Sequence, residues 1–239
     1  MIAAKRDNIV PFPCKIINGD KSAKETIMHK STRMWCLKDE EEIQALFNTF
    51  KNKILNAHTE VKYKIGMRNL TMYVCAINIG LRGGDFCSLK WSDIYDDDWT
   101  FKIHAEYVPK KTRKCHKHIN LTWSSDLEVV LEKWRDLINP EDINSYIFQS
   151  QKGEKLTQKA WYKIVENTRK EAGIDQKIGT HGLRKTMANQ YIKNSDDKTR
   201  ALLEVSTMFG HSDLRITERY ACLEDENIKA TKQKMAFLC

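Results

Sequence analysis

Residues 181–220 read HGLRKTMANQYIKNSDDKTRALLEVSTMFGHSDLRITERY, and this stretch decides how the rest of the chain is interpreted. It contains a His-Gly-Leu-Arg step at His181–Arg184, a Phe-Gly-His step that ends at His211, and Tyr220, nine residues after that histidine. Arginine neutralises phosphate oxygens through a fixed fork of donors, histidine moves protons near neutral pH, and tyrosine can become a covalent nucleophile. Together these residue types favour chemistry on a phosphodiester.

The composition is that of an ordinary globular protein with a cationic surplus. Of the 239 residues, 41% are hydrophobic and 30% are charged, and a chain of this length supports one large core or two smaller ones. Lys and Arg number 40 against 32 Asp and Glu, which gives a formal net charge of +8 at pH 7. This surplus favours a polyanionic partner, although many proteins carry a similar charge only to stay soluble.

Several features favour a reducing intracellular location. The seven cysteines are odd in number and include no C-x-x-C pair, so we expect reduced thiols instead of a disulfide framework. Residues 1–6 lead from Met-Ile-Ala-Ala straight into Lys and Arg, without the apolar stretch of a signal peptide. No apolar run approaches the ~20 residues that a membrane-spanning helix needs. We expect a cytoplasmic protein that is associated with the nucleoid and makes no membrane contact.

Hydrophobic periodicity predicts a mainly helical chain after an irregular start. Residues 1–35 are polar, carry two of the four prolines and show little periodicity, so we expect an N-terminal arm without regular structure. An alternative is an edge strand at residues 11–17. Two helices are predicted next, with apolar stripes over residues 43–54 and 63–77, and Gly80 is placed to end the second one.

A small antiparallel sheet is predicted in the middle of the chain. Residues 101–107 and a second run that ends at Leu121 alternate apolar and polar side chains, and the connection between them is strongly basic. Ser125 and Glu128 have the spacing of a capping box for the helix that follows, which Asn139-Pro140 would end.

The remaining residues predict short helices with defined ends. A short strand is expected at residues 146–148, followed by a helix from Thr157 to about Glu171. Helical pieces continue beyond it, with breaks near Gly179, residues 194–197 and Gly210. The expected fold class is mainly α with a small antiparallel β-sheet, that is, α+β.

Three motifs carry a family resemblance. Residues 80–94 read GLRGGDFCSLKWSDI, residues 181–184 read HGLR, and residues 209–212 read FGHS, with Thr217 and Tyr220 following at fixed steps. In this order, and with the basic hairpin between the first two, they resemble the arginine and histidine boxes of the tyrosine recombinase catalytic domain, the family of the phage integrases. The resemblance covers about residues 37–223 and implies that family's catalytic-domain fold for residues 36–239, with a tail helix from about residue 224.

The resemblance implies a mechanism that its residue types can perform. Tyr220 would attack a DNA phosphate and form a 3′-phosphotyrosyl bond, and His181 would accept the phenol proton. Arg82 and Arg184 would grip the non-bridging oxygens, and His211 would donate a hydrogen bond to one of them. The bond keeps its energy, so the implied strand exchange needs neither a metal nor ATP nor another cofactor.

The basic hairpin would supply the acid of this reaction. Lys111, in a Lys-Thr step that resembles the family's Lys-Thr-Gly turn, would protonate the departing 5′-oxygen, although Arg113 replaces the glycine. Lys110 and Lys114 are alternatives for that role, and Lys110, Arg113 and Lys114 are also candidates for contacts with DNA phosphates. Asp85 would support the site by orienting the arginines.

The resemblance also implies partners and leaves alternatives open. The expected partner is double-stranded DNA, on which a protein that is monomeric in solution would assemble as a homotetramer, with a possible accessory DNA-bending protein. A type IB topoisomerase and an inactive DNA-binding regulator of the same fold are the rival interpretations. The sequence does not decide the DNA site, or whether the enzyme of a mobile element integrates, excises or inverts.

Overall fold

The computed structural model describes residues 34–102, 105–110 and 118–223. The chain divides into two units between residues 33 and 34, and all the described residues belong to the second one. The predicted general acid, Lys111, lies outside the described residues, as do Arg113, Lys114, the N-terminal arm to residue 33 and the tail expected from residue 224.

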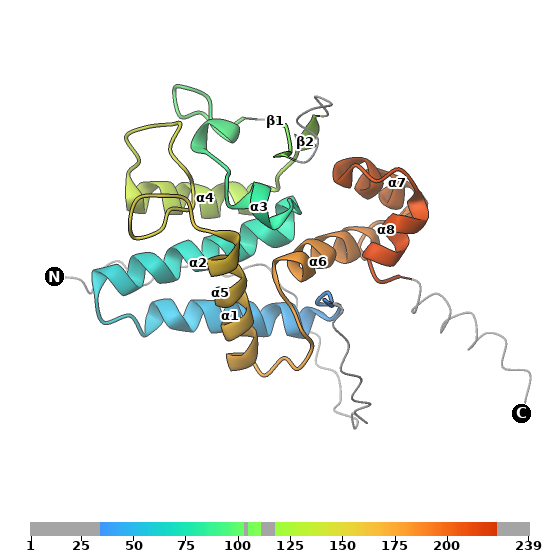
Figure 1. Ribbon diagram of the computed structural model, residues 1–239, viewed down its shortest axis with the longest axis horizontal. Coiled ribbons are helices and arrows are strands. Elements are labelled where there is room, and N and C mark those ends of the chain that lie inside the picture. The colour runs from blue at the N-terminus through green and yellow to red at the C-terminus, as the bar shows by residue number, and fades with distance from the viewer. Residues whose placement is uncertain (1–33, 103–104, 111–117, 224–239) are drawn as a thin grey trace, which may run out of the picture. The chain divides into compact units, whose positions relative to one another are not determined.

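The described residues form a mainly helical fold with one two-stranded antiparallel sheet, as the sequence predicted (Figure 1). In chain order the elements are α1 (Glu40–Leu55), α2 (Glu60–Ile79), α3 (Gly83–Phe86), a 3₁₀ turn (Trp91–Asp93), β1 (Ala105–Tyr107), β2 (Ile119–Leu121), α4 (Ser125–Ile138), α5 (Gln158–Glu171), α6 (Thr180–Lys193), α7 (Lys198–Phe209) and α8 (Leu214–Tyr220). No helix in these ranges combines the length and the apolar character needed to cross a bilayer.

Helix α2 is the central element, and it contacts α1, α4 and α6 (Figure 1). Its first turn is capped by Thr59, whose hydroxyl accepts the Lys62 N–H at 3.2 Å. The predicted end at Gly80 is confirmed, because this glycine adopts φ +66°, a left-handed conformation that stops a helix at little cost. A long helix that is buried on several sides therefore delivers the chain directly to the first arginine motif.

Five buried aromatic rings join the helices beneath that motif. Phe50 of α1 lies 5.3 Å from Tyr73 of α2 and 6.3 Å from Trp161 of α5, measured between ring centroids. Phe86 of α3 lies 6.4 Å from Trp161 and 5.2 Å from Phe148. Aromatic pairs at such distances add stabilisation beyond the burial of their area, so the four-residue α3 is anchored in the main core.

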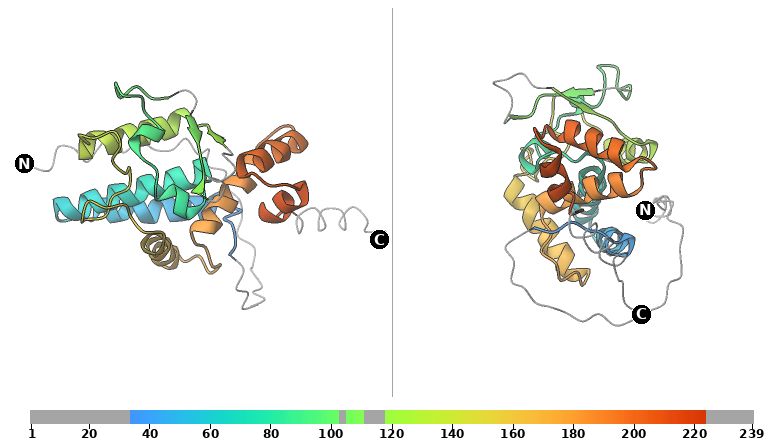
Figure 2. Two further views of the ribbon diagram at one scale, coloured as in Figure 1. Left: turned by 45° about the horizontal axis from the view of Figure 1, so that its top comes forward. Right: turned by 90° about the vertical axis from the view of Figure 1, so that its right-hand side faces the viewer.

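The sheet is shorter than its sequence pattern. Ala105 pairs with Leu121 and Tyr107 with Ile119, in antiparallel register. Figure 2 shows this hairpin next to α7, and β2 contacts that helix. The strand predicted at residues 146–148 is wrong, because the segment makes only an isolated bridge, between Tyr146 and Lys90. Its apolar residues are buried as a loop against the aromatic core instead.

The observed helix ends agree with the predicted ones except at the start of α4. The predicted capping box at Ser125 and Glu128 is wrong by one position, since Ser124 is the N-cap and its hydroxyl accepts the Leu127 N–H. The predicted end at Asn139 is confirmed, with φ +46° at that residue. The helix boundaries predicted at Thr157, Gly179 and Gly210 are also confirmed.

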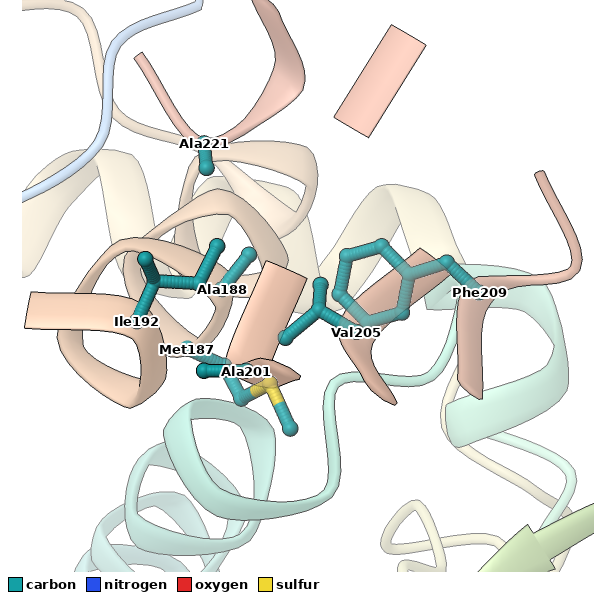
Figure 3. Packing of buried hydrophobic residues seen from close by; sticks show 7 residues of the cluster. All are labelled: Met187, Ala188, Ile192, Ala201, Val205, Phe209 and Ala221. Carbon is teal, nitrogen blue, oxygen red and sulfur yellow. The ribbon is translucent and has the colours of Figure 1, made fainter. Parts of the chain in front are cut away.

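The C-terminal helices build a second, smaller core. Helix α7 packs on α6, and α8 packs on α7. Figure 3 shows the side chains that fill the space between them, which are Met187, Ala188, Ile192, Ala201, Val205, Phe209 and Ala221. Because Ala221 directly follows Tyr220, this core fixes the end of the helix that carries the predicted nucleophile.

Candidate active site

The first arginine sits in a glycine turn that packs directly against α5 and α6. Arg82 is the N-cap of α3, between the left-handed Gly80 and the helical Gly83. A Cβ on Gly83 would lie 3.0 Å from the Thr180 hydroxyl and 3.2 Å from the Gln158 amide nitrogen. The glycines thus let the backbone of Arg82 approach the starts of two helices that lie far along the chain.

The second arginine is buried and fixed from two sides. Arg184 is 3% exposed, and its guanidinium donates to the carbonyl oxygen of Gly80 and, at 3.5 Å, to that of Phe209. Its Cζ lies 3.7 Å from the centroid of the Phe209 ring. Burial lowers the pKa of Arg184 to about 10, which leaves the guanidinium charged at neutral pH. Arg184 therefore presents a fixed positive charge and joins the end of α2 to the end of α7.

Arg82 and Arg184 both line a pocket of about 350 Å³ that is open to solvent. Its lining comes from the α3 turn, the residue before the undescribed hairpin connection, and the starts of α5 and α6. The residues are Arg82, Gly83, Gly84, Asp85, Lys110, Gln158, Thr180, His181 and Arg184. The pocket therefore gathers both predicted arginines, one predicted histidine and one hairpin lysine around one space.

Tyr220 lies against the histidine of this pocket. Its hydroxyl is 3.1 Å from His181 Nδ1, and the two rings meet edge to face at 4.9 Å. Burial raises the pKa of Tyr220 to about 12, with the positive charge of Arg184 opposing the rise. Desolvation lowers the pKa of His181, and the charges of Lys185, Arg184 and Arg82 lower it further. At neutral pH a protonated phenol thus faces a neutral imidazole that can accept its proton.

The His211 ring also lies near the Tyr220 ring, at 5.4 Å between ring centroids. Its Nδ1 lies 2.9 Å from the hydroxyl of the fully buried Thr217. Desolvation, followed by the charges of Arg184 and Arg82, lowers the pKa of His211 to about 4, so the ring is neutral near pH 7. When the Thr217 hydroxyl donates to Nδ1, the remaining proton resides on Nε2 and is available to a phosphate oxygen.

Asp85 contacts the hairpin as well as acting on an arginine. This residue is 4% exposed, and its Oδ1 accepts the backbone N–H of Lys110 at 3.0 Å. Its negative charge raises the pKa of Arg184. Lys110 lines the pocket, and its ammonium donates to the Ser88 hydroxyl at 2.7 Å. Asp85 thereby connects the arginine turn to the start of the basic connection.

Three side chains around the site were not singled out as site residues from the sequence. Gln158 and Thr180 line the pocket, and Lys185 points its ammonium toward the Tyr220 ring, 5.6 Å from the centroid. Lys185 lies one helical turn after His181, a spacing that could have drawn attention to it. Gln158 and Thr180 are the first residues of α5 and α6 and carry no motif of their own.

Comparison with known proteins gives a consistent family. The model of the phage integrase family matches residues 38–227. The tyrosine recombinase XerD of Listeria monocytogenes (serotype 4b, strain F2365) is 27% identical over 172 residues, which are 70% of this chain and 54% of XerD. The chain thus spans about half the length of that curated relative.

Two solved structures share the fold. One is the XerH site-specific recombinase in a post-cleavage complex with its palindromic difH substrate, with a TM-score of 0.62 and 22% identity over 83% of this chain and 52% of XerH. The other is the catalytic domain of bacteriophage HP1 integrase, with a TM-score of 0.52 and 19% identity, covering 84% of this chain and 95% of that domain. With the matched family model spanning every described motif, the chain belongs to the phage integrase family, and residues 38–227 correspond to its tyrosine recombinase catalytic domain.

Proposed function

We propose that this chain is a site-specific DNA recombinase that cuts and rejoins DNA through a covalent bond to Tyr220. The observation that carries the proposal is the 3.1 Å contact between the Tyr220 hydroxyl and His181, beside the pocket that Arg82 and Arg184 share. A nucleophile, its base and two phosphate-binding cations are the parts that metal-independent phosphoryl transfer requires. The contact occurs within one chain, so we propose cleavage in cis.

The chemistry follows from the position of each group. The phosphate would enter the pocket with its non-bridging oxygens on Arg82 and Arg184, and His211 would donate to one of them through Nε2. Tyr220 would attack the phosphorus as His181 takes its proton, and the bond from phosphorus to the 5′-oxygen would break. The products are a 3′-phosphotyrosyl bond and a free 5′-hydroxyl. A second 5′-hydroxyl can reverse these steps and join a new strand.

The departing 5′-oxygen needs a proton, and we assign it to a lysine of the basic hairpin connection. Lys111 is our candidate from its resemblance to the family motif. Lys110 is the alternative, because it lines the pocket and its ammonium is hydrogen-bonded to the Ser88 hydroxyl. Arg113 and Lys114 are proposed to contact DNA phosphates beside the cut.

We further propose double-stranded DNA as the partner, a proposal supported by the structure of XerH bound to its palindromic difH substrate. The net charge of +8 is consistent with an anionic partner. On paired sites we expect a homotetramer formed from monomers in solution, with an accessory DNA-bending protein as a possible further component. The reaction would use no metal, ATP or other cofactor, and would take place on DNA in the cytoplasm.

The test is formation of a covalent adduct on nicked DNA. When the enzyme cuts close to a nick, the short fragment that carries the free 5′-hydroxyl diffuses away. Rejoining is then prevented, and the adduct is trapped. Because the target is not defined, the probes are two pools of nicked duplexes, one from the DNA that flanks the gene and one with randomised arms. We expect the wild-type chain to form an adduct that survives denaturation, and Tyr220→Phe to form none.

A matched tyrosine variant and a plasmid assay complete the design. Tyr191 of α6 is 42% exposed and donates to Glu204, so Tyr191→Phe should keep the adduct. DNA binding without an adduct in the wild type would favour an inactive regulator. Relaxation of a supercoiled plasmid that lacks the selected site would favour a type IB topoisomerase.

A further inference from the structure

The turn that directly follows Tyr220 has an unusual backbone. Cys222 adopts φ +60°, a left-handed conformation that normally favours glycine. The Cys222 N–H donates to the Arg219 carbonyl at 3.3 Å, and the Leu223 N–H donates to the Glu218 carbonyl at 3.1 Å. These two bonds form a Schellman motif, in which glycine is the usual residue at the position that Cys222 occupies. Helix α8 therefore ends in a turn that its own sequence disfavours.

Two distant segments hold this turn in place. Asn189 of α6 donates its side-chain amide to the Ala221 carbonyl at 2.9 Å. Lys38 donates its ammonium to the Cys222 carbonyl at 3.1 Å, across 184 positions of sequence. Cys222 is 3% exposed, and the Ala221 side chain reaches the core between α6 and α7 (Figure 3). A disfavoured backbone conformation persists when such surroundings determine it.

Lys38 belongs to a lead-in segment, residues 34–38, that lies along α6 (Figure 1). The Leu37 N–H donates to the Thr186 hydroxyl at 2.8 Å, and the Lys185 ammonium donates to the Met34 carbonyl at 3.0 Å. The Lys38 carbonyl in turn accepts from the Gln190 side chain at 3.0 Å. The lead-in is therefore fixed on the helix that also carries His181 and Arg184.

We propose that Lys38 is a positioning residue for Tyr220, which it serves by holding the left-handed turn at Cys222 against α6. The inference rests on the proposed function of Tyr220 as nucleophile. Tyr220 is the last residue of α8 and lies two positions before the held carbonyl. A loosened turn lets the end of α8 rotate, and the phenol then leaves the 3.1 Å contact with His181 more often. Near-attack geometry is sensitive to displacements of this kind.

The test variant is Lys38→Met, which keeps an unbranched side chain and removes the donor. The matched control is Lys193→Met, because the Lys193 ammonium contacts the same segment, at the Lys38 carbonyl (3.3 Å), without contacting the Cys222 turn. Both variants lose one positive charge, so the net charge of the chain falls equally in the two. On the selected nicked DNA, with enzyme in excess, we expect adduct formation to slow by about 10–100-fold in Lys38→Met. The control should stay within about twofold of the wild type, as surface substitutions usually do.

A rescue variant separates positioning from a direct role of Lys38 on DNA. Glycine adopts the left-handed conformation without strain, so Cys222→Gly should hold the turn without help from Lys38. We expect Lys38→Met with Cys222→Gly to cleave faster than Lys38→Met alone. If Lys38 acted on DNA directly, the glycine would restore nothing, and that result would overturn the proposal.

Amide hydrogen exchange without DNA provides a readout that does not depend on activity. The amides of Cys222 and Leu223 should exchange faster in Lys38→Met than in the wild type and in Lys193→Met. Unchanged exchange would contradict the proposal even in a chain that forms the adduct. A different outcome is that the wild type forms no adduct while Lys38→Met still exchanges faster than the wild type. That outcome would contradict the proposed function and leave Lys38 as a support of the turn only.

Discussion

The two halves of the candidate site, the arginines and the helix that carries Tyr220, are packed to different extents. The half that would bind the phosphate rests on the main core, because Arg184 is 3% exposed on α6 and Arg82 follows the buried end of α2. The half that would attack is the seven-residue α8, where Leu214 and Ile216 are 37% and 46% exposed. Its position depends on a small core and on a few long-range hydrogen bonds at its end.

This difference in support predicts which substitutions reduce activity without unfolding the chain. Preorganised cations are useful only if they do not move during the reaction, and the burial of Arg184 holds its guanidinium in place. A nucleophile must enter and leave a covalent bond to DNA, and a lightly held helix allows that. Substitution of a buried residue of the first half, such as Arg184, should therefore combine catalytic and structural damage, whereas substitutions in the second half should separate the two.

The largest loss of cleavage rate is expected for substitution of the general acid. A modified DNA probe separates this loss from a defect in the nucleophile. Loss of a proton donor to the leaving group should slow cleavage by about 10²–10⁴-fold. A DNA probe with sulfur in place of the bridging 5′-oxygen has a leaving group that needs no proton, so Lys111→Ala should recover on this probe. Lys38→Met should not recover, because its defect lies with the nucleophile. Recovery by Lys110→Ala but not by Lys111→Ala would move the role to Lys110.

A comparison of the two arginines tests the link between burial and damage. Arg82→Ala and Arg184→Ala should each slow cleavage by about 10²–10³-fold, the usual cost of one preorganised donor. Only Arg184→Ala should also lower the free energy of unfolding, by about 2–4 kcal/mol, because it leaves buried carbonyls without a donor and opens a cavity. Urea unfolding of both variants measures this difference. Equal destabilisation would show that the two arginines are supported alike.

A single methyl group tests how closely the lead-in lies on α6. A Cβ on Gly182 would come within 2.4 Å of the Trp35 carbonyl oxygen, a backbone atom that can move only with its segment. We expect Gly182→Ala to lower the free energy of unfolding by about 1–3 kcal/mol. The matched control is Gly66→Ala in α2, which gains the same helix propensity and whose nearest atom, at 2.9 Å, belongs to the Ile54 side chain instead of to backbone. Equal thermal stability of the two variants would argue against a close approach of the Trp35 backbone to α6.

The smallest effect concerns pH. The pKa of His211 is lowered from 6.5 to about 4 in the folded chain, so the unfolded chain binds a proton in this window while the folded chain does not. Stability should therefore fall as the pH falls from about 6.5 toward 4. His211→Gln should show a shallower fall in urea midpoints than the wild type, with His58→Gln as the control for an exposed histidine. Parallel curves for His211→Gln and the wild type would contradict the lowered pKa.

Local signals predicted much of the fold because caps and periodicity are local. Gly80, Asn139 and Gly210 end helices as expected, since each adopts the left-handed conformation that their residue types favour. The strand at residues 146–148 failed because an apolar run indicates burial and does not by itself indicate pairing.

Some of the site residues could likewise be predicted from the sequence, and others could not. Arg82, His181 and Arg184 belong to recognisable motifs, and the structure brings them into one pocket. The Lys38 contact with Cys222 spans 184 positions, and no motif or periodicity connects such residues. The role of Lys111 stays a prediction, because that residue lies outside the described ranges.

The attachment site of DNA on the protein tests the central claim most directly. Trypsin cuts after Arg219 and Lys229, so Tyr220 is the only tyrosine of the peptide YACLEDENIK. Mass spectrometry of the digested adduct should find the nucleotide on this peptide, linked through a 3′-phosphate to the phenolic oxygen. Attachment to any other residue, or through a 5′-phosphate, would contradict the account.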